Sequence, residues 1–214
     1  MKHRWNLILF MTITGITLIS AGLYGYVSYS RTGTASPADL GISRFVTPTP
    51  FFMHEVLTDT TYHSDNGRVK LIAFILINCP DGACPMTMYD FADIRNGLRN
   101  AGVYGEQAEL VAITIDPEND DSEFLRSYAR AFDADPEGWR MLRSTDGSLQ
   151  NLAGEIGYAF QVHPDGTGFH ATTMYLLDHE HQIRAVHRMA SATNQSDTER
   201  ITAQMLHLAS DATD

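Results

Sequence analysis

The pattern of apolar and polar positions along the chain predicts alternating strands and helices. Residues 69–77 and residues 110–115 are nearly continuous apolar runs, which is typical of strands covered on both faces in a parallel sheet. Between them, apolar residues recur every three or four positions from Pro85 to Ala101, and Gly102 follows as a stop signal, so a helix is expected there. A strand, a helix and a second strand in this order form one right-handed crossover unit of a parallel sheet.

The second half of the chain continues this alternation and ends with a hairpin and a helix. Asp120 followed by Glu123 resembles the N-terminal cap of a second helix, and Ser196 with Glu199 forms a capping box before a last helix. The elements expected between these two helices are a strand near residues 139–142, a short helix at 149–156, and two strands at 174–177 and 183–186 that enclose a turn. A βαβ start closed by an antiparallel hairpin is the order of the thioredoxin-like fold, an α/β fold with a mixed central sheet flanked by helices.

The first thirty residues carry a separate signal. After Lys2 and Arg4 the chain has no charged residue from Trp5 to Ser30, and about 20 apolar residues as a helix are enough to cross a bilayer. Because the basic residues precede this run, the N-terminus is expected in the cytoplasm and the rest of the chain on the extracytoplasmic side of the cell membrane, as a single-pass protein. The expected parts are a cytoplasmic stub and transmembrane anchor at residues 1–30, a linker with Gly and Pro at 31–50, and the thioredoxin-like domain at 51–214.

A cleaved signal peptide is the alternative interpretation of this segment. The apolar run is longer than the usual signal-peptide core of about 7–15 residues, and no clean Ala-x-Ala cleavage site follows it. Both observations favour an uncleaved anchor.

The composition of the chain excludes some kinds of binding partner and one kind of scaffold. Lys plus Arg number 15 against 26 Asp plus Glu, which gives a formal net charge of −11. Such a chain is not expected to bind nucleic-acid phosphate or an anionic membrane face by charge attraction. The chain has only 2 cysteines, so a scaffold held together by several disulfides is excluded.

The two cysteines, Cys79 and Cys84, lie where the first buried strand gives way to a helix. Pro85 suits the first helical position, which places Cys84 near the helix N-terminus, where unpaired backbone N–H groups and the helix dipole favour a thiolate. Pro80 and Gly82 favour a loop that brings the two sulfurs together. A structural disulfide or two buried thiols is the plain alternative, but a tight loop gains little stability from closure. Two thiolates with one imidazole suit Cu(I), whereas structural zinc usually needs four protein ligands.

Three motifs together resemble the Sco/SenC family. They are Cys-Pro-Asp with a second Cys-Pro at 79–85, Ile-Asp-Pro-Glu at 115–118 before the Tyr-Ala-Arg-Ala-Phe segment at 128–132, and Phe-His-Ala-Thr-Thr-Met-Tyr-Leu at 169–176. This family comprises extracytoplasmic proteins of thioredoxin fold that are implicated in delivering copper to the binuclear copper centre of cytochrome c oxidase. The similarity extends over roughly residues 45 to 208.

The resemblance implies a site and a function. Cys79, Cys84 and His170 correspond to the family's copper ligands, for Cu(I) or Cu(II), and the two cysteines form a redox-active pair. The implied protein is a membrane-anchored metallochaperone, not an enzyme in the turnover sense, whose partner is the copper-site subunit of cytochrome c oxidase or another cuproprotein. One feature departs from the family: four residues, 80–83, separate the cysteines here, whereas the family usually has three.

Several alternatives remain open at this level. His163 is a substitute metal ligand or part of a turn, and Met86 and Met88 are extra soft ligands or packing residues. Asp116 either tunes the thiol site or caps a turn. A thiol-disulfide oxidoreductase acting on extracytoplasmic protein cysteines is the second function, and a peroxiredoxin-like peroxidase is the third.

Overall fold

The computed structural model describes residues 41–43, 45–79, 82–191 and 194–212, all of which belong to the unit Pro37–Asp214. The expected transmembrane anchor at residues 1–30 lies outside the described residues, as does much of the expected linker. Within the described ranges, no helix combines the length and the apolar character that crossing a bilayer requires.

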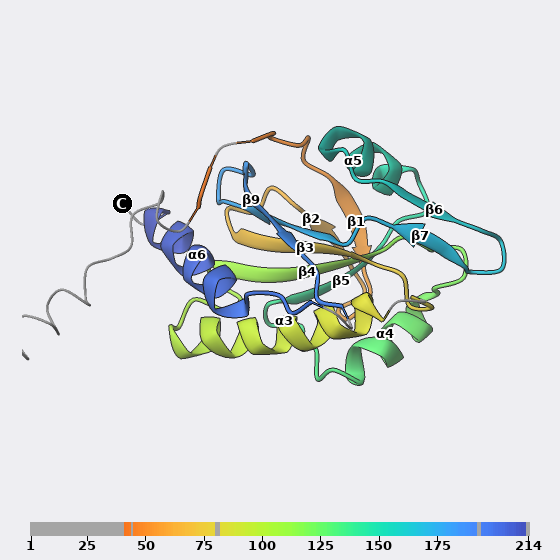
Figure 1. Ribbon diagram of the computed structural model, residues 1–214, viewed down its shortest axis with the longest axis horizontal. Coiled ribbons are helices and arrows are strands. Elements are labelled where there is room, and N and C mark those ends of the chain that lie inside the picture. Colours follow the sequence, from red (N-terminus) through yellow and green to blue (C-terminus); the bar gives the residue numbers. More distant parts are fainter. Residues whose placement is uncertain (1–40, 44, 80–81, 192–193, 213–214) are drawn as a thin grey trace, which may run out of the picture. The chain divides into compact units, whose positions relative to one another are not determined.

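A seven-stranded mixed sheet forms the centre of this unit, with strand order β2-β1-β5-β4-β3-β8-β9 (Figure 1). The three middle strands β3, β4 and β5 are parallel, and β1 and β8 pair with them antiparallel on either side. Every residue of β3 and β4 is buried, which explains why both strands read as continuous apolar runs. The strands of this sheet are β1 (Phe52–Glu55), β2 (Thr60–His63), β3 (Val69–Ile75), β4 (Ala108–Thr114), β5 (Trp139–Arg143), β8 (Thr173–Leu177) and β9 (Ile183–Arg188).

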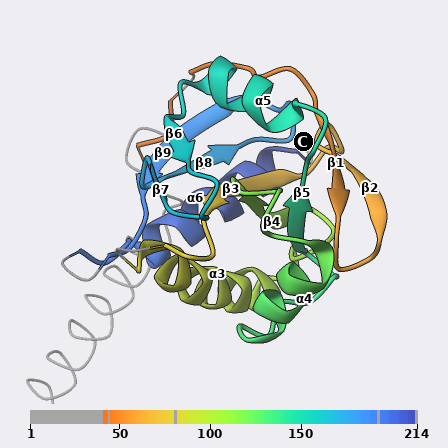
Figure 2. The same cartoon turned by 90° about the vertical axis from the view of Figure 1, so that its right-hand side faces the viewer.

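Helices cover both faces of the sheet. Figures 1 and 2 show α3 (Ala83–Asn100), α4 (Ser122–Arg130) and α6 (Thr198–Asp211) on one face, with α3 and α6 side by side. On the other face lie α5 (Ser148–Ile156) and a separate two-stranded sheet of β6 (Phe160–Val162) and β7 (Gly168–His170). The predicted α/β architecture, a mixed central sheet flanked by helices, is therefore confirmed for the described residues.

The expected elements are present, with four additions. Strands β1, β2, β6 and β7 were not predicted, because each has only 3 or 4 residues and too few positions to show an alternating pattern. Helix α3 begins at Ala83 instead of Pro85, with Gly82 as its N-cap in a left-handed conformation (φ 72°). Cys84 is consequently the second helical residue and not a residue just before the helix.

The sequence-based N-caps of two helices were each wrong by one residue. The carboxylate that accepts the backbone N–H of Phe124 at the start of α4 belongs to Asp121, at 2.8 Å, while Asp120 accepts the hydroxyl of Thr114 instead. At α6 the cap is Asp197, because the expected cap Ser196 donates its hydroxyl to a carboxylate of α3. In both cases a tertiary contact takes the more N-terminal side chain away from the helix end.

Residues 42, 43 and 45–51 belong to the described part of the chain and contact the domain, although most of them fall within the expected linker. The backbone N–H of Ser43 donates to the carbonyl of Arg184 at 2.8 Å, and that of Phe45 donates to the carbonyl of Ile183 at 3.0 Å. The chain thereby covers the open edge of β9, where unpaired backbone groups would otherwise be available to another strand.

Candidate metal centre

The two cysteines lie at the carboxyl end of β3, where the chain turns into α3. Cys79 follows the strand after a short loop and is half-buried, whereas Cys84 is fully buried in the first turn of the helix. The Sγ atom of Cys84 accepts the backbone N–H of Leu76 at 3.2 Å, which fixes this sulfur against the strand end. No disulfide joins the two residues, so both sulfurs are thiols in this structure.

His170, at the end of β7, meets both sulfurs. Its Nε2 atom is 3.6 Å from Sγ of Cys79 and 3.4 Å from Sγ of Cys84. The three donor atoms all lie within 4.8 Å of one another, and they form the one cluster of three or more potential metal-ligating His, Cys, Asp or Glu side chains found among the described residues. The structure thus brings together the three residues that the sequence singled out.

This donor set suits a soft metal ion. Two thiolates and an imidazole are ligands that Cu(I) accepts at low coordination number, and a structural zinc ion would lack its usual fourth protein ligand. The half-buried position of Cys79 leaves one side of the cluster accessible, while Cys84 is shielded. The arrangement can therefore hold a metal ion and still admit an incoming ligand.

The turn of the β6–β7 hairpin lies close to the loop that carries Cys79. Gly166, at the turn, has a φ of 77° and lies so close to the strand ends that a Cβ atom there would be 3.4 Å from both Asn78 Nδ2 and Asp116 Oδ2. Asn78 directly precedes Cys79. The hairpin therefore touches the cysteine loop at its turn as well as at His170.

The other residues considered from the sequence do not join the cluster. His163 is exposed at the hairpin turn, where its backbone N–H donates to the carbonyl of Thr167 at 2.7 Å. Met88 is fully buried in the core, and Asp116 accepts both contacts of the Asn119 amide at 2.9 and 3.0 Å. These positions support the turn and packing interpretations of His163, Met88 and Asp116.

Sequence reasoning missed Tyr158, whose hydroxyl lies 3.2 Å from Nδ1 of His170. It precedes the histidine by 12 residues in a part of the chain with no recognisable motif, so no sequence signal indicated this contact. Burial raises the pKa of Tyr158 above its usual value, and the neighbouring Cys84 adds to this shift. Burial likewise raises the pKa of Tyr128, and the charges of Cys84 and Cys79 add to this shift.

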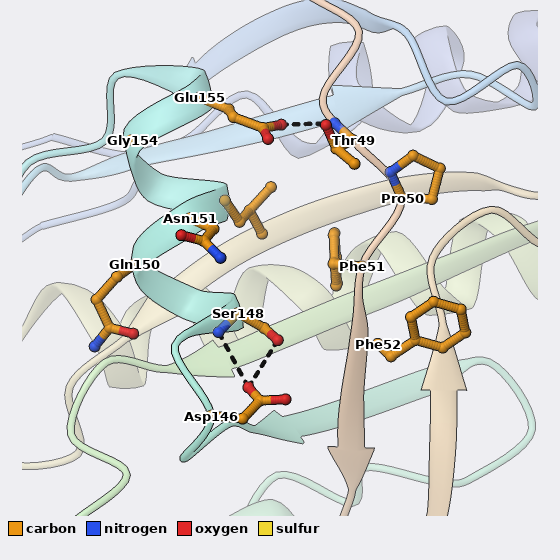
Figure 3. Close-up of a pocket in the computed structure, with 11 residues that line it drawn as sticks. Thr49, Pro50, Phe51, Phe52, Asp146, Ser148, Gln150, Asn151, Gly154 and Glu155 are labelled. Atoms are coloured by element: carbon orange, nitrogen blue, oxygen red, sulfur yellow. Dashed lines mark hydrogen bonds between the residues drawn. The ribbon is translucent and has the colours of Figure 1, made fainter.

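A separate cleft of about 600 Å³ lies between α5 and the segment that leads into β1 (Figure 3). The backbone N–H of Thr49 donates to Glu155 across it at 2.6 Å, and Asp146 accepts the backbone N–H and hydroxyl of Ser148. The lining residues include no cysteine and no histidine, so the cleft is not a second soft-metal site.

The carboxyl groups of Asp120 and Asp116 predict that the stability of the fold depends on pH. Burial raises the pKa of Asp120 to about 6; the hydrogen bond from Thr114 opposes the shift, and the Asp116 carboxylate adds to it. The unfolded chain has an Asp pKa of about 3.9, so the folded state binds more protons between roughly pH 4 and pH 6. The free energy of unfolding should consequently fall as pH rises through this window, by on the order of 2–3 kcal/mol.

The substitution Asp120→Asn tests this prediction, because an amide cannot titrate. Denaturant unfolding at a series of pH values should show a smaller decline between pH 4 and 6 in the variant than in the unaltered chain. Glu118→Gln, which removes an exposed carboxylate from the same loop, should leave the slope unchanged. Equal slopes for Asp120→Asn and the unaltered chain would contradict the assignment.

The chain is similar to known proteins in sequence and in fold. A family model described as SCO1/SenC matches residues 53–208. A SCO1/SenC family lipoprotein from Bacillus anthracis has a TM-score of 0.66 at 19% identity, with 76% of this chain and 94% of that chain covered. ScoI from Arabidopsis thaliana, solved with copper bound, has a TM-score of 0.61 at 20% identity, covering 76% and 99%.

A third solved structure, BsSco, is described as containing a disulfide switch and as a member of the Sco family of cytochrome c oxidase assembly proteins. It has a TM-score of 0.64 at 18% identity, with 79% of this chain and 96% of that chain covered. At these identities the solved structures establish a shared fold. No curated protein sequence matches the chain at a significant level.

Proposed function

Because this chain belongs to the SCO1/SenC family, we propose that it is a copper metallochaperone that assists assembly of the copper centre of cytochrome c oxidase. The observation that carries the proposal is the convergence of Cys79, Cys84 and His170, whose donor atoms lie within 4.8 Å of one another. Copper is the cargo of such a protein. The copper-bound ScoI from Arabidopsis thaliana and the description of BsSco support the metal and the partner, respectively.

The different environments of the three ligands suit holding and releasing a metal ion. Cys84 is buried and its sulfur accepts a backbone N–H, so it serves as the fixed ligand. Cys79 is half-buried, and His170 sits on a hairpin that is not part of the central sheet. A thiolate or imidazole of the acceptor, the copper-site subunit of the oxidase or another cuproprotein, can therefore approach copper from the side of Cys79.

The proposal includes a membrane tether and an extracytoplasmic domain. Its support is the charge-free run from Trp5 to Ser30 behind Lys2 and Arg4. The full chain should remain with the membrane fraction after alkaline carbonate washing, and a protease added outside the cytoplasmic membrane should digest the domain. Release of the domain by carbonate would contradict the tether.

Copper titration of the reduced protein without oxygen tests the function directly. The unaltered chain should bind one copper ion tightly, and His170→Ala should weaken Cu(II) binding by about tenfold or more while the two thiolates still retain Cu(I). His163→Ala is the matched control, because His163 lies on the same hairpin and outside the cluster. It should bind both oxidation states as the unaltered chain does.

Two results would contradict the proposal. One is the absence of tight one-to-one copper binding by the reduced, folded protein. The other is a His170→Ala variant that binds Cu(II) as tightly as the unaltered chain.

A thiol-disulfide oxidoreductase is the second candidate function. Its support is that the two sulfurs lie within 4.8 Å of one another. They are close enough to join in a disulfide of about 2 Å by thiol exchange, in which the disulfide of a partner protein is reduced to two thiols. The disulfide switch described for BsSco is consistent with such chemistry. A reduction potential far more negative than those of exchange enzymes, together with no exchange with protein disulfides, would count against it.

A further inference from the structure

We propose that Tyr158 is a positioning residue that, together with the backbone carbonyl of Ala171, holds the imidazole of His170 so that Nε2 faces the two cysteine sulfurs. The inference rests on the proposed copper-binding function of the cluster. The hydroxyl of Tyr158 contacts Nδ1 of the ring. It therefore acts on the nitrogen opposite Nε2, the atom that faces the sulfurs.

Two polar groups of the described residues lie next to Nδ1 of His170. The carbonyl oxygen of Ala171 is 3.1 Å from Nδ1, and the hydroxyl of Tyr158 is 3.2 Å from the same atom. A carbonyl oxygen only accepts hydrogen bonds, so Nδ1 carries the hydrogen in that contact, and the hydroxyl oxygen of Tyr158 is a second acceptor for the same hydrogen. Nε2 is then left with its lone pair, which is the form in which a neutral imidazole binds a metal ion.

The ring of Tyr158 is held by the central sheet. Tyr158 is only 5% exposed, and its ring stacks on Phe74 of β3 with centroids 4.1 Å apart. A second contact, edge to face, joins it to Tyr175 of β8 at 6.3 Å. Both strands have a neighbouring strand on each side in the seven-stranded sheet, so the hydroxyl occupies a fixed position.

His170, by contrast, belongs to an element with little support of its own. The β6–β7 hairpin forms its own two-stranded sheet, separate from the central one. The backbone N–H of Ala171 donates to the carbonyl of Ala159 at 2.8 Å, which places the histidine beside the segment that carries Tyr158. Tyr158 therefore links the imidazole to the rigid sheet and opposes rotation of the ring away from the sulfurs.

The substitution Tyr158→Phe removes the hydroxyl and keeps the ring that packs on Phe74. In the metal-free, reduced protein, nitrogen NMR of the His170 imidazole should show hydrogen predominantly on Nδ1 in both proteins, because the Ala171 carbonyl remains as an acceptor. The imidazole signals of the variant should shift and broaden, because the ring loses its contact with the Tyr158 hydroxyl. The dissociation constant for Cu(II) should rise roughly tenfold, as for other groups that orient a metal-binding histidine, and the nitrogen coupling in the Cu(II) spectrum should change.

Tyr175→Phe is the matched control. Tyr175 is buried in the same aromatic cluster, but its hydroxyl contacts Thr173 at 3.4 Å. This variant should leave the His170 imidazole signals, the Cu(II) spectrum and the Cu(II) dissociation constant as they are in the unaltered chain. An effect of Tyr158→Phe that Tyr175→Phe does not reproduce is therefore due to the hydroxyl next to Nδ1.

The inference is overturned if Tyr158→Phe leaves both the imidazole signals and the Cu(II) dissociation constant unchanged. If that variant fails to fold, nitrogen NMR of the unaltered, metal-free protein still tests the inference. A hydrogen on Nε2 of His170 would contradict the proposed orientation, in which Nδ1 carries the hydrogen and Nε2 faces the sulfurs. The NMR measurement needs no metal. Failure of the unaltered chain to bind copper would therefore count against the proposed function without deciding the position of the ring.

Discussion

Replacing Cys84 by serine should reduce the affinity of the reduced protein for Cu(I) by roughly a thousandfold or more, equivalent to about 4 kcal/mol of binding free energy. Serine has nearly the same shape and can still accept the N–H of Leu76 that now reaches the sulfur at 3.2 Å. Its hydroxyl, however, is a hard and un-ionised group that does not replace a thiolate as a ligand for Cu(I). Only one sulfur and the imidazole of His170 would remain.

Competition with a coloured Cu(I) chelator in the absence of oxygen measures this loss. Met86→Leu is the control, because Met86 carries the next sulfur along the chain and leucine conserves its volume. If Met86→Leu binds Cu(I) as tightly as the unaltered chain and Cys84→Ser does not, the thiol of Cys84 is a ligand of Cu(I). Retention of tight Cu(I) binding by folded Cys84→Ser would remove Cys84 from the ligand set.

The second large effect concerns stability and lies at the other end of the sheet. Glu109→Ala should lower the free energy of unfolding by about 3–5 kcal/mol, the usual cost of leaving a buried charge without its partner. Glu109 in β4 and Lys70 in β3 lie opposite each other in the sheet, and both are fully buried. Burial lowers the pKa of Lys70 to about 8, and the negative charge of Glu109 opposes that shift.

Glu109 also holds together a set of hydrogen bonds. Its carboxylate accepts the hydroxyl of Tyr62 at 2.6 Å, the amide of Asn66 at 2.7 Å and the guanidinium of Arg140 at 3.2 Å. Alanine would leave the Tyr62 hydroxyl and the Asn66 amide without this acceptor. It would also remove the carboxylate that pairs with Arg68 and Arg140, and the negative charge that acts on buried Lys70. The loss should therefore exceed that expected for a single hydrogen bond.

Denaturant unfolding measures the effect, and copper titration of the folded variant separates it from function. The network lies near the start of β3 and β4, whereas the cysteines follow the end of β3, so the folded variant should bind copper with unchanged stoichiometry. Glu106→Ala, an exposed carboxylate just before β4, should change stability by no more than about 0.5 kcal/mol. Similar values for the two variants would show that the buried charge is not a main source of stability.

The fold was predictable where burial imposes a strong pattern on the sequence. Residues 69–75 and 110–114 are strand residues because both of their faces are covered, and the only polar residues among them are Lys70 and Thr114. The helix that follows Cys79 was predicted from its three-to-four spacing. What the pattern did not fix were positions that depend on contacts distant in sequence, such as the true caps Asp121 and Asp197.

The candidate site was predictable in composition and not in geometry. Cys79, Cys84 and His170 were identified from motifs, but the sequence does not contain the distances of 3.4 and 3.6 Å that bring the imidazole to the sulfurs. Those distances depend on a hairpin whose strands have 3 residues each, too short to be recognised, and on a turn at Gly166 packed against Asn78. Tyr158 was missed for the same reason, because only the fold brings it to His170.

X-ray absorption at the copper edge is the most direct test of the central claim, that Cys79, Cys84 and His170 bind one copper ion together. The reduced full chain loaded with one equivalent of Cu(I) should show two sulfur neighbours and one nitrogen neighbour of imidazole type around copper. Cys79→Ser should remove one of the sulfur neighbours. A spectrum with no sulfur neighbour, or one that Cys79→Ser and His170→Ala both leave unchanged, would contradict the account.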